Sequence, residues 1–234
     1  MSVMKIITSG KVKTVYDAGE GEAVIEFRDD ITAGDGAKKE AKVGKGSINA
    51  EISARLLEFL EERGVKTHLK EFVRPNKFLV EKVEIIPVEV ILRNIATGSL
   101  VRRFPFEEGS ELNPPIVEFG YKNDDYHDPM LNDEIALALN LCTMDDLIVM
   151  RRMALQVNDL LKEFFLERGI LLVDFKLEFG RTPEGEIILA DEISPDTCRF
   201  WDSKTREVMD KDRFRKDMGS VIEFYSEVRR RVLS

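Results

Sequence analysis

Acidic and basic residues at alternate positions in the segment 173–180 are the first candidates for chemistry in this chain. If this segment is a β-strand, Asp174, Lys176 and Glu178 share one face, while apolar side chains occupy the other. A Thr-Pro-Glu-Gly turn follows, and a second predicted strand leads to Asp191. A hairpin centred in that turn places Glu178 directly opposite Asp191, although a slip of one residue would change the faces.

Two carboxylates in this position predict a site for a divalent cation. Like charges directly opposite each other are destabilising in a sheet, and a cation between them removes that penalty. Oxygen-only ligands suit Mg²⁺, which commonly takes one or two carboxylates together with substrate phosphates. Two solvated surface acids would show the same spacing, because one face of an antiparallel sheet is often exposed. From the residues alone, both interpretations of Glu178 and Asp191 stay open.

A glycine turn with two lysines near the N-terminus is a candidate phosphate-binding loop. The run Gly10, Lys11, Val12, Lys13 precedes a β-rich segment rather than a helix, so it is not the loop of P-loop NTPases. Lysines at alternate positions of a glycine turn can still cover phosphates from a sheet, as the Gly-rich loop of protein kinases does. Lys82, at the end of a predicted strand, is a second candidate. A solvated turn is the alternative, because exposed hairpins often contain Gly-Lys pairs.

A second group of polar residues would give an acidic protein the local positive charge that an anionic substrate needs. The candidates are Arg93, Ser99, Arg102, Arg103, Lys122 and Arg199. Forked guanidinium groups and backbone amides of a turn are suited to a phosphate monoester. Arg93 is embedded between apolar residues, which favours a functional position, whereas Arg102 and Arg103 are equally explained as surface arginines.

Composition and charge argue against several classes of protein. The net charge of -9 argues against non-specific binding to nucleic acid. With only His68 and His127 as histidines and no nucleophile elbow, a hydrolytic triad is not indicated. Cys142 and Cys198 lie far apart without metal-type spacing, which predicts no disulfide framework and a reducing cytoplasm. We expect no signal peptide and no membrane partner, because no apolar run approaches a membrane span.

These residues need strands and helices to position them, and the pattern of apolar residues predicts both. Period-two alternation and turn residues predict strands at 11–16, 23–27, 78–83, 88–93, 116–119, 170–179 and 186–193. Apolar residues at every third or fourth position predict helices at 47–63, 143–168 and 212–233. Segments rich in Gly, Pro, Asn and Asp predict loops at 32–38 and over most of 104–129.

The order of these elements predicts an α+β fold. Hydrophobic residues make up 43% of the 234 residues, the usual share for a globular protein with a substantial core. Strands come early and long helices late. We therefore expect a small N-terminal antiparallel-sheet lobe, residues 1–84, and a larger C-terminal α+β lobe, residues 85–234. Thr143 followed by Asp146 predicts a capping box at the start of the longest helix.

Two long segments resemble the signatures of the SAICAR synthetase family, enzymes of de novo purine synthesis. They are PVEVILRNIATGS at 87–99 and LVDFKLEFG at 172–180. The resemblance also includes the segments 10–16, 33–37, 127–129, 132–134, 191–196, 199–202 and 210–214. It extends over essentially the whole chain, without an appended carboxylase domain, as in the short monofunctional members of the family.

The resemblance implies a ligase reaction. ATP, the carboxylated aminoimidazole ribonucleotide CAIR and L-aspartate would give SAICAR, ADP and phosphate, through an acyl phosphate of the CAIR carboxylate. Such chemistry requires positioning and charge neutralisation rather than a protein nucleophile. The resemblance further implies ATP bound between two lobes, Mg²⁺, a cytoplasmic location and often a homodimer. The competing interpretations are a non-catalytic nucleotide-binding module and a small-molecule phosphotransferase.

The resemblance also assigns roles to individual residues. The nucleotide would be held by Gly10, Lys11, Val12 and Lys13 at its phosphates and by Glu81, Lys82 and Val83 near the lobe crossing, with Mg²⁺ on Glu178 and Asp191. CAIR would be bound by Arg93, Ser99 and Arg199 at its phosphate and by Lys122 and Asp128 near its ribose or imidazole. The reacting carboxylate would face Asp174 and Lys176, with Lys176 stabilising the developing charge. Closure over the substrate, or contact with aspartate, would come from Gly34, Asp35 and Gly36.

Overall fold

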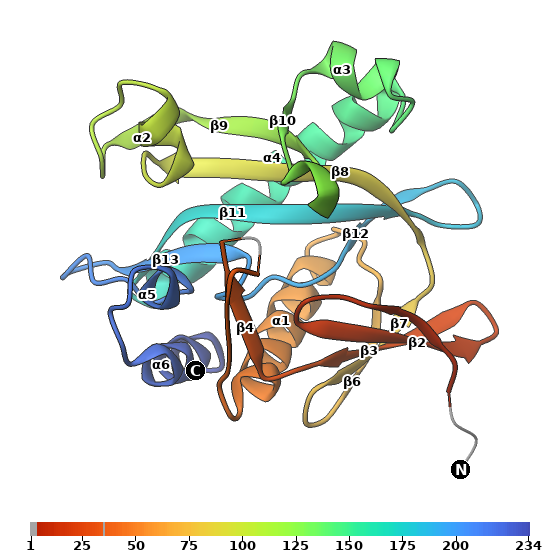
Figure 1. Ribbon diagram of the computed structural model, residues 1–234, viewed down its shortest axis with the longest axis horizontal. Helices are drawn as coiled ribbons and strands as arrows, with labels where there is room; N and C mark the ends of the chain where they lie inside the picture. Colours follow the sequence, from red (N-terminus) through yellow and green to blue (C-terminus); the bar gives the residue numbers. More distant parts are fainter. Residues whose placement is uncertain (1–3, 35) are drawn as a thin grey trace.

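The computed structural model describes residues 4–34 and 36–234, and its first layer is an antiparallel sheet near the N-terminus. The five strands of this sheet pair in the order β1-β2-β3-β7-β6. Their bounds are β1 Ile6–Ser9, β2 Lys13–Gly19, β3 Glu22–Phe27, β6 Leu69–Val73 and β7 Lys77–Glu81. A separate two-stranded hairpin stands beside the sheet and consists of β4 Asp30–Ala33 and β5 Lys38–Ala41 (Figure 1).

A second antiparallel sheet forms the larger part of the protein. Its central strands, β8 Glu84–Ile95 and β11 Ile170–Arg181, pair with each other. β9 and β10 continue the sheet on the side of β8, whereas β12 and β13 both pair with the other edge of β11. The bounds of these outer strands are β9 Glu111–Tyr121, β10 Met130–Leu131, β12 Ile187–Ala190 and β13 Cys198–Asp202.

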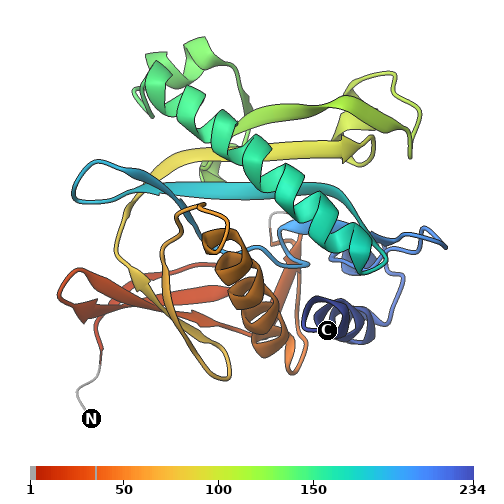
Figure 2. The same ribbon diagram turned by 180° about the vertical axis from the view of Figure 1, so that it is seen from behind.

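Three long helices cover the sheets. α4 Met144–Glu167 runs diagonally across the second sheet, over β8 and β11 (Figure 2). α1 Lys45–Glu61 packs on β3, β6 and β7 of the first sheet, and α6 Val221–Val232 packs on α1. The shorter elements are α2 Ser99–Arg103, η1 Asp124–Tyr126, α3 Asp133–Ala138 and α5 Asp212–Arg215. None of the described helices is long and apolar enough to cross a membrane.

The predicted capping box and apolar stripe of α4 are confirmed. The Thr143 hydroxyl accepts a hydrogen bond from the Asp146 backbone N–H at 3.2 Å, and the Asp146 carboxylate accepts one from the Thr143 N–H at 2.8 Å. Leu147, Met150 and Leu161 lie on the buried face. The helix therefore begins at its predicted residue and packs its apolar face on the sheet, which fixes β11 from behind.

The single helix expected at 212–233 is instead two helices, α5 and α6. Between them Asp217 and Ser220 have φ angles of 54° and 50°, which a right-handed helix does not allow. Met218, at an apolar position of the expected helix, is 43% exposed. The helical spacing of apolar residues therefore continues across the end of α5 and the start of α6. This spacing alone does not reveal that the helix is interrupted.

The strand expected at 116–119, within the loops of 104–129, is part of a longer strand, β9. This strand includes Pro114 and Pro115, which lack the N–H that a sheet ladder uses. The prolines lie where the register between β9 and β8 shifts, and away from β10, which pairs only with the other end of β9. Pro87 likewise lies inside β8, which begins at Glu84 rather than at the expected residue 88. The expected loop at 32–38 is shorter, because its ends belong to β4 and β5.

The chain crosses from the first sheet to the second between β7 and β8. Val83 lies in this crossing and packs against Gly180 of β11, where a Cβ would stand 2.2 Å from Cγ2 of Val83. Only glycine allows the crossing to approach β11 so closely. The division of the chain into lobes 1–84 and 85–234 stays a prediction.

Candidate active site

A cavity of about 870 Å³ is lined by residues of both sheets and of the β4–β5 hairpin. Arg102 and Arg103 do not line this cavity, whereas all the other predicted site residues that the structure describes do. From the first sheet and the hairpin these are Gly10, Lys11, Val12, Lys13, Gly34, Gly36, Glu81, Lys82 and Val83. From the second sheet and its loops these are Arg93, Ser99, Lys122, Asp128, Asp174, Lys176, Glu178, Asp191 and Arg199. Asp35 lies outside the described residues.

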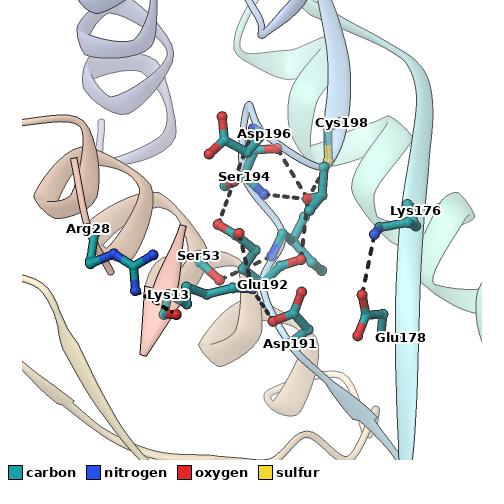
Figure 3. A network of polar contacts seen from close by, with 12 residues as sticks. Lys13, Arg28, Ser53, Lys176, Glu178, Asp191, Glu192, Ser194, Asp196 and Cys198 are labelled. Carbon is teal, nitrogen blue, oxygen red and sulfur yellow. Dashed lines mark hydrogen bonds and ion pairs between the residues drawn. The ribbon is translucent and has the colours of Figure 1, made fainter. Parts of the chain in front are cut away.

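The two predicted metal-binding acids come together, but not through the predicted register. Glu178 is 4% exposed and pairs with Ala190, so the expected pairing with Asp191 is wrong by one residue. Asp191 follows the end of β12 with a φ of 61°, in the left-handed region. With the backbone turned in this way, both carboxylates reach the cavity and lie next to each other (Figure 3). On the other side of β11, Glu178 lies directly opposite Glu89 of β8.

Lysines from both sheets neutralise these two acids. Lys13 of β2 pairs with Asp191 and lies 3.1 Å from a carboxylate oxygen of Glu192, and Lys122 pairs with Glu178. Burial lowers the pKa of Lys13, but the neighbouring carboxylates outweigh burial and hold this pKa above its usual value. Burial likewise raises the pKa of Asp191, yet the lysines hold it well below the usual range. The Lys13 and Asp191 side chains are therefore both charged at neutral pH.

Lys176 bridges the facing glutamates of β8 and β11. Its Nζ lies 2.7 Å from Oε1 of Glu89 and 3.3 Å from Oε1 of Glu178. Burial lowers the pKa of Lys176, but the two carboxylates raise it above the usual value. Burial raises the pKa of Glu89, and the Lys176 charge opposes that shift. The lysine removes the repulsion between facing acids and presents a fixed positive charge to the cavity.

The donor set of Glu178 and Asp191 fits a hard divalent cation. Both supply carboxylate oxygens, the ligands that Mg²⁺ prefers. Within residues 4–34 and 36–234, no group of three or more His, Cys, Asp or Glu side chains is arranged to hold a metal ion. Two acids suffice for Mg²⁺, because this ion keeps several waters and takes substrate phosphates as further ligands. The pair therefore suits Mg²⁺ that binds together with a nucleotide.

Arg28, which the sequence reasoning missed, holds the glycine loop in place. Its guanidinium donates to the carbonyl oxygen of Gly10 at 2.6 Å and to that of Lys13 at 2.9 Å. Lys11 in the same loop pairs with Asp124 of the second sheet's loops at 2.8 Å. The loop is therefore fixed from both sides of the cavity. No motif in the sequence marks Arg28, because its partners are backbone carbonyls of a distant turn.

Further along β11, two arginines share one carboxylate. Arg93 is 2% exposed and donates to Asp174 at 3.2 Å and to the hydroxyl of Ser99 at 2.9 Å. Arg199 donates to the same Asp174 oxygen at 2.7 Å. At Gly98, whose φ is 61°, a Cβ would stand 2.9 Å from the Arg199 guanidinium. Two forked donors and a hydroxyl are thus gathered for an anion, and Asp174 orients both forks.

The remaining predicted residues line the cavity with fewer contacts. Lys82 is exposed, with its Nζ 3.7 Å from a nearby aspartate. Asp128 accepts a hydrogen bond from the Asn123 backbone N–H at 2.9 Å. Gly34 and Gly36 have φ angles of 57° and 90° in the turn between β4 and β5. These residues border the cavity, and the geometry does not assign them a ligand.

His68 and Glu89 line the cavity as well, although the sequence reasoning did not select them. His68 Nε2 lies 3.1 Å from the carbonyl oxygen of Asp191, and burial lowers the pKa of His68 to about 4, so its ring is neutral at pH 7. Glu89 lies within the signature 87–99, and the pairing of β8 with β11 is the signal that could have found it. His68 has no comparable signal, because only tertiary packing brings it to the cavity.

Comparisons with known proteins identify relatives that match almost the whole chain. The family model described as SAICAR synthetase matches residues 6–232. The phosphoribosylaminoimidazole-succinocarboxamide synthase of Methanocaldococcus jannaschii is 58% identical over 224 residues, which cover 96% of this chain and 93% of that protein. The enzyme of the same name from Pyrococcus furiosus is 51% identical and covers 97% of each chain.

Solved structures show the same fold. A SAICAR synthetase in complex with ADP superimposes with a TM-score of 0.95 at 47% identity, covering 97% of both chains. The SAICAR synthetase of Pyrococcus horikoshii OT3 gives a TM-score of 0.88 at 45% identity, covering 99% of this chain and 97% of the other. These structures confirm the α+β fold with antiparallel sheets. The chain belongs to the SAICAR synthetase family.

Proposed function

We propose that this protein is an ATP-dependent ligase that joins L-aspartate to the carboxylate of CAIR and yields SAICAR, ADP and phosphate. One observation carries the proposal: a single cavity holds two anion sites, the lysines around Glu178 and Asp191 and the arginines around Asp174. The relatives named phosphoribosylaminoimidazole-succinocarboxamide synthase and the related structure with ADP support it. A nucleotide at one site and a phosphorylated substrate at the other would share one enclosed space.

The reaction proceeds in two transfers. A carboxylate is a poor acyl donor, so an oxygen of the CAIR carboxylate first attacks the γ-phosphorus of ATP. A bond forms between that oxygen and phosphorus, and the bond to ADP breaks. The amine of aspartate then attacks the acyl carbon, so that a C–N bond forms and phosphate leaves with the activated oxygen. The protons released from the amine pass to phosphate and solvent.

The cavity lysines neutralise negative charge during both transfers. Lys11 and Lys13 belong to the loop that covers the nucleotide phosphates. Lys176, with its pKa raised, stays protonated beside the reacting carboxylate. Positive charges that are already in place stabilise the transition state without reorganisation. Glu178 and Asp191 would hold Mg²⁺, and the bound ion would polarise phosphoryl oxygens of the nucleotide.

The arginines fix the other end of the substrate. Arg93, Ser99 and Arg199 bind the phosphate of CAIR through forked and hydroxyl donors. β11 then sets the distance between the phosphate site and the nucleotide site, because Asp174, Lys176 and Glu178 follow one another along the strand. The CAIR carboxylate lies between the anchored phosphate and the nucleotide, within reach of Lys176. Lys122 and Asp128 contact the ribose or imidazole in between.

Three further features belong to the proposal. The nucleotide binds at the crossing between lobes 1–84 and 85–234, with Glu81 and Val83 at the adenine and Lys82 beside them. Cys142 and Cys198 are free thiols, which supports a cytoplasmic location. A homodimer stays a prediction that sedimentation equilibrium would check.

One assay tests the proposed function. The protein is incubated with Mg-ATP, CAIR and L-aspartate, while SAICAR absorbance and phosphate release are followed. We expect both signals to appear together and to stop when aspartate is omitted. ATP turnover that does not depend on aspartate would contradict the ligase. Transfer of phosphate to a small molecule without its release would indicate a phosphotransferase, and nucleotide binding without turnover would indicate a binding module.

A further inference from the structure

His68 is a buried histidine in the cavity wall that the mechanism above does not use. It lies in the segment between α1 and β6, and it is 3% exposed. Its backbone N–H donates to the carbonyl oxygen of Leu189 in β12 at 2.9 Å, and its own carbonyl oxygen accepts from the Glu81 N–H in β7 at 2.8 Å. The backbone of His68 is therefore bonded to a strand of each sheet, which fixes the place of its ring.

The ring contacts the backbone of Asp191 rather than its carboxylate. Nε2 of His68 lies 3.1 Å from the Asp191 carbonyl oxygen. A carbonyl oxygen only accepts, so Nε2 carries the hydrogen and donates. Asp191 has a φ of 61°, which costs free energy in a residue with a Cβ and persists only where surrounding contacts determine it. The His68 hydrogen bond is one of these contacts, and the bond from the Ile193 N–H to the Ser53 hydroxyl at 3.1 Å holds the chain just beyond it.

The left-handed turn at Asp191 is what brings its carboxylate to the metal site. In the pairing of β11 with β12, Glu178 lies opposite Ala190. If β12 continued in an extended form, Asp191 would lie opposite Leu177 and its side chain would share the apolar face of the sheet. The turn instead directs the Asp191 carboxylate into the cavity beside Glu178 (Figure 3). The metal-binding pair therefore depends on the conformation of one backbone position.

We propose that His68 is a positioning residue, whose Nε2–H holds the Asp191 backbone in the turn that directs its carboxylate to Mg²⁺. This inference rests on the proposed function, because it takes Glu178 and Asp191 as the metal-binding acids. The carbonyl oxygen of His68 also accepts from Glu81, which borders the proposed adenine position. One residue thus connects the metal-binding end of the nucleotide site to its base-binding end, through a ring hydrogen bond on one side and a backbone hydrogen bond on the other.

Calorimetry of ADP binding with and without Mg²⁺ tests this role and requires no turnover. His68→Leu removes the ring donor, whereas His68→Gln keeps an N–H donor on a side chain of similar reach. Neither change removes the backbone bonds to Leu189 and Glu81. We expect His68→Leu to raise the Kd for Mg-ADP about 10- to 100-fold, with the Kd for metal-free ADP unchanged within about threefold, as for other contacts that orient a metal ligand. His68→Gln should recover most of the affinity for Mg-ADP.

Thr67→Val is the matched control for damage to the same segment. Thr67 is buried, and its hydroxyl donates to Glu61 at 2.6 Å. This control should lower the free energy of unfolding without changing the gain in ADP affinity that Mg²⁺ supplies. If His68→Leu weakened both forms of ADP equally, His68 would have only a structural role and the proposal would be overturned. Unchanged affinity for Mg-ADP would overturn it as well.

Two further comparisons keep the test decisive. If His68→Leu does not fold, His68→Asn takes its place, because the shorter amide does not reach the Asp191 carbonyl oxygen. His68→Asn should then bind Mg-ADP more weakly than His68→Gln, and equal affinities would refute the positioning role. If the wild type binds Mg-ADP more tightly than metal-free ADP, and His68→Leu loses this difference, the role of His68 stands even where no SAICAR forms and the proposed reaction has failed.

Discussion

Replacing Gly180 with alanine should disturb the crossing between the two sheets and weaken nucleotide binding. Val83 in the crossing packs directly on Gly180 of β11. A Cβ at residue 180 would stand 2.2 Å from Cγ2 and 2.7 Å from Cβ of Val83. Carbon atoms in contact lie about 3.5–4.0 Å apart. The crossing must therefore move by roughly 1.3 Å, the difference between 3.5 and 2.2 Å, or the Val83 side chain must leave its rotamer.

The expected loss of stability follows from two opposing effects. Overpacking of this kind costs about 1–3 kcal/mol. Alanine in a strand is favoured over glycine by about 0.5–1 kcal/mol, because it loses less backbone entropy on folding. Gly180 is not among the residues with positive φ, so backbone strain adds nothing. The net destabilisation of Gly180→Ala should be about 0–2.5 kcal/mol, the difference between these ranges.

Denaturant unfolding followed by the fluorescence of Trp201, the only tryptophan, measures this loss. Gly120→Ala is the matched control, because no atom lies closer than 3.9 Å to the Cβ it would add in β9. That control should be neutral or slightly stabilising. In the double variant Gly180→Ala/Val83→Gly both clashing atoms are gone, so the double variant should be more stable than the sum of the single changes by at least about 0.5 kcal/mol.

The kinetic consequence follows from the proposed place of Val83 at the adenine. A displacement of this size can cost up to about 100-fold in rate or affinity. We expect the KM for ATP to rise while the KM for CAIR stays constant. Arg93 of β8 and Arg199 of β13 lie beside Asp174, well along β11 from Gly180. Strict additivity of the Gly180 and Val83 substitutions would refute the close approach as the cause. A stability loss with an unchanged KM for ATP would refute the position of Val83 beside the nucleotide.

Four further substitutions test the two metal-binding acids, the pH dependence of stability and the start of α4. Glu178→Gln and Asp191→Asn should each lower turnover by at least about 100-fold and weaken the dependence of nucleotide binding on Mg²⁺, measured by Mg²⁺ titration; full activity in both variants would contradict the metal site. Hydrogen bonds from the arginines at 230 and 231 lower the pKa of Glu227 to about 2, so its stabilising effect is present above about pH 4.5 and is lost as the pH falls toward 2. Because Glu227 is partly exposed, Glu227→Gln should cost only about 0.5–1 kcal/mol at pH 7 and nothing near pH 2, as denaturation at both pH values would show. Thr143→Ala should lower the free energy of unfolding by about 1 kcal/mol, whereas no change would mean that the capping box does not stabilise α4.

Local patterns predict the fold where an element determines its own structure. Thr143 and Asp146 satisfy the first turn of α4 from within the helix, so the sequence alone predicts its beginning. The break between α5 and α6 has no such signal. The residues around Met218 leave the helical region through positive φ angles, while the apolar period carries on into α6. Hydrophobic spacing reports which face is buried, and it does not report backbone conformation.

The site residues also fall into two groups: those that a local pattern predicts and those that depend on contacts between distant segments. The alternation of one strand places Lys176 and Glu178 on a common face, and no partner strand is needed for that inference. Their neighbours Glu89 and Asp191 depend on the register between strands, which a single residue of slip changes. Arg28 depends on a contact between a side chain and a distant turn, which neither periodicity nor a motif records.

The paired lysines change the interpretation of the two metal-binding acids. In the hairpin register expected from the sequence, removal of one acid relieves repulsion and stabilises the protein without metal. In the folded protein Glu178 instead contacts Lys122 and Lys176, and Asp191 contacts Lys13. Removal of either acid therefore takes a carboxylate partner from these lysines, although Lys176 keeps Glu89 and Lys13 keeps Glu192. A protein of net charge -9 thereby keeps its phosphate-binding lysines ready by pairing them with its metal-binding acids. When a magnesium nucleotide binds, the phosphates can take the lysines and the cation the acids, so no buried charge loses a partner without gaining another.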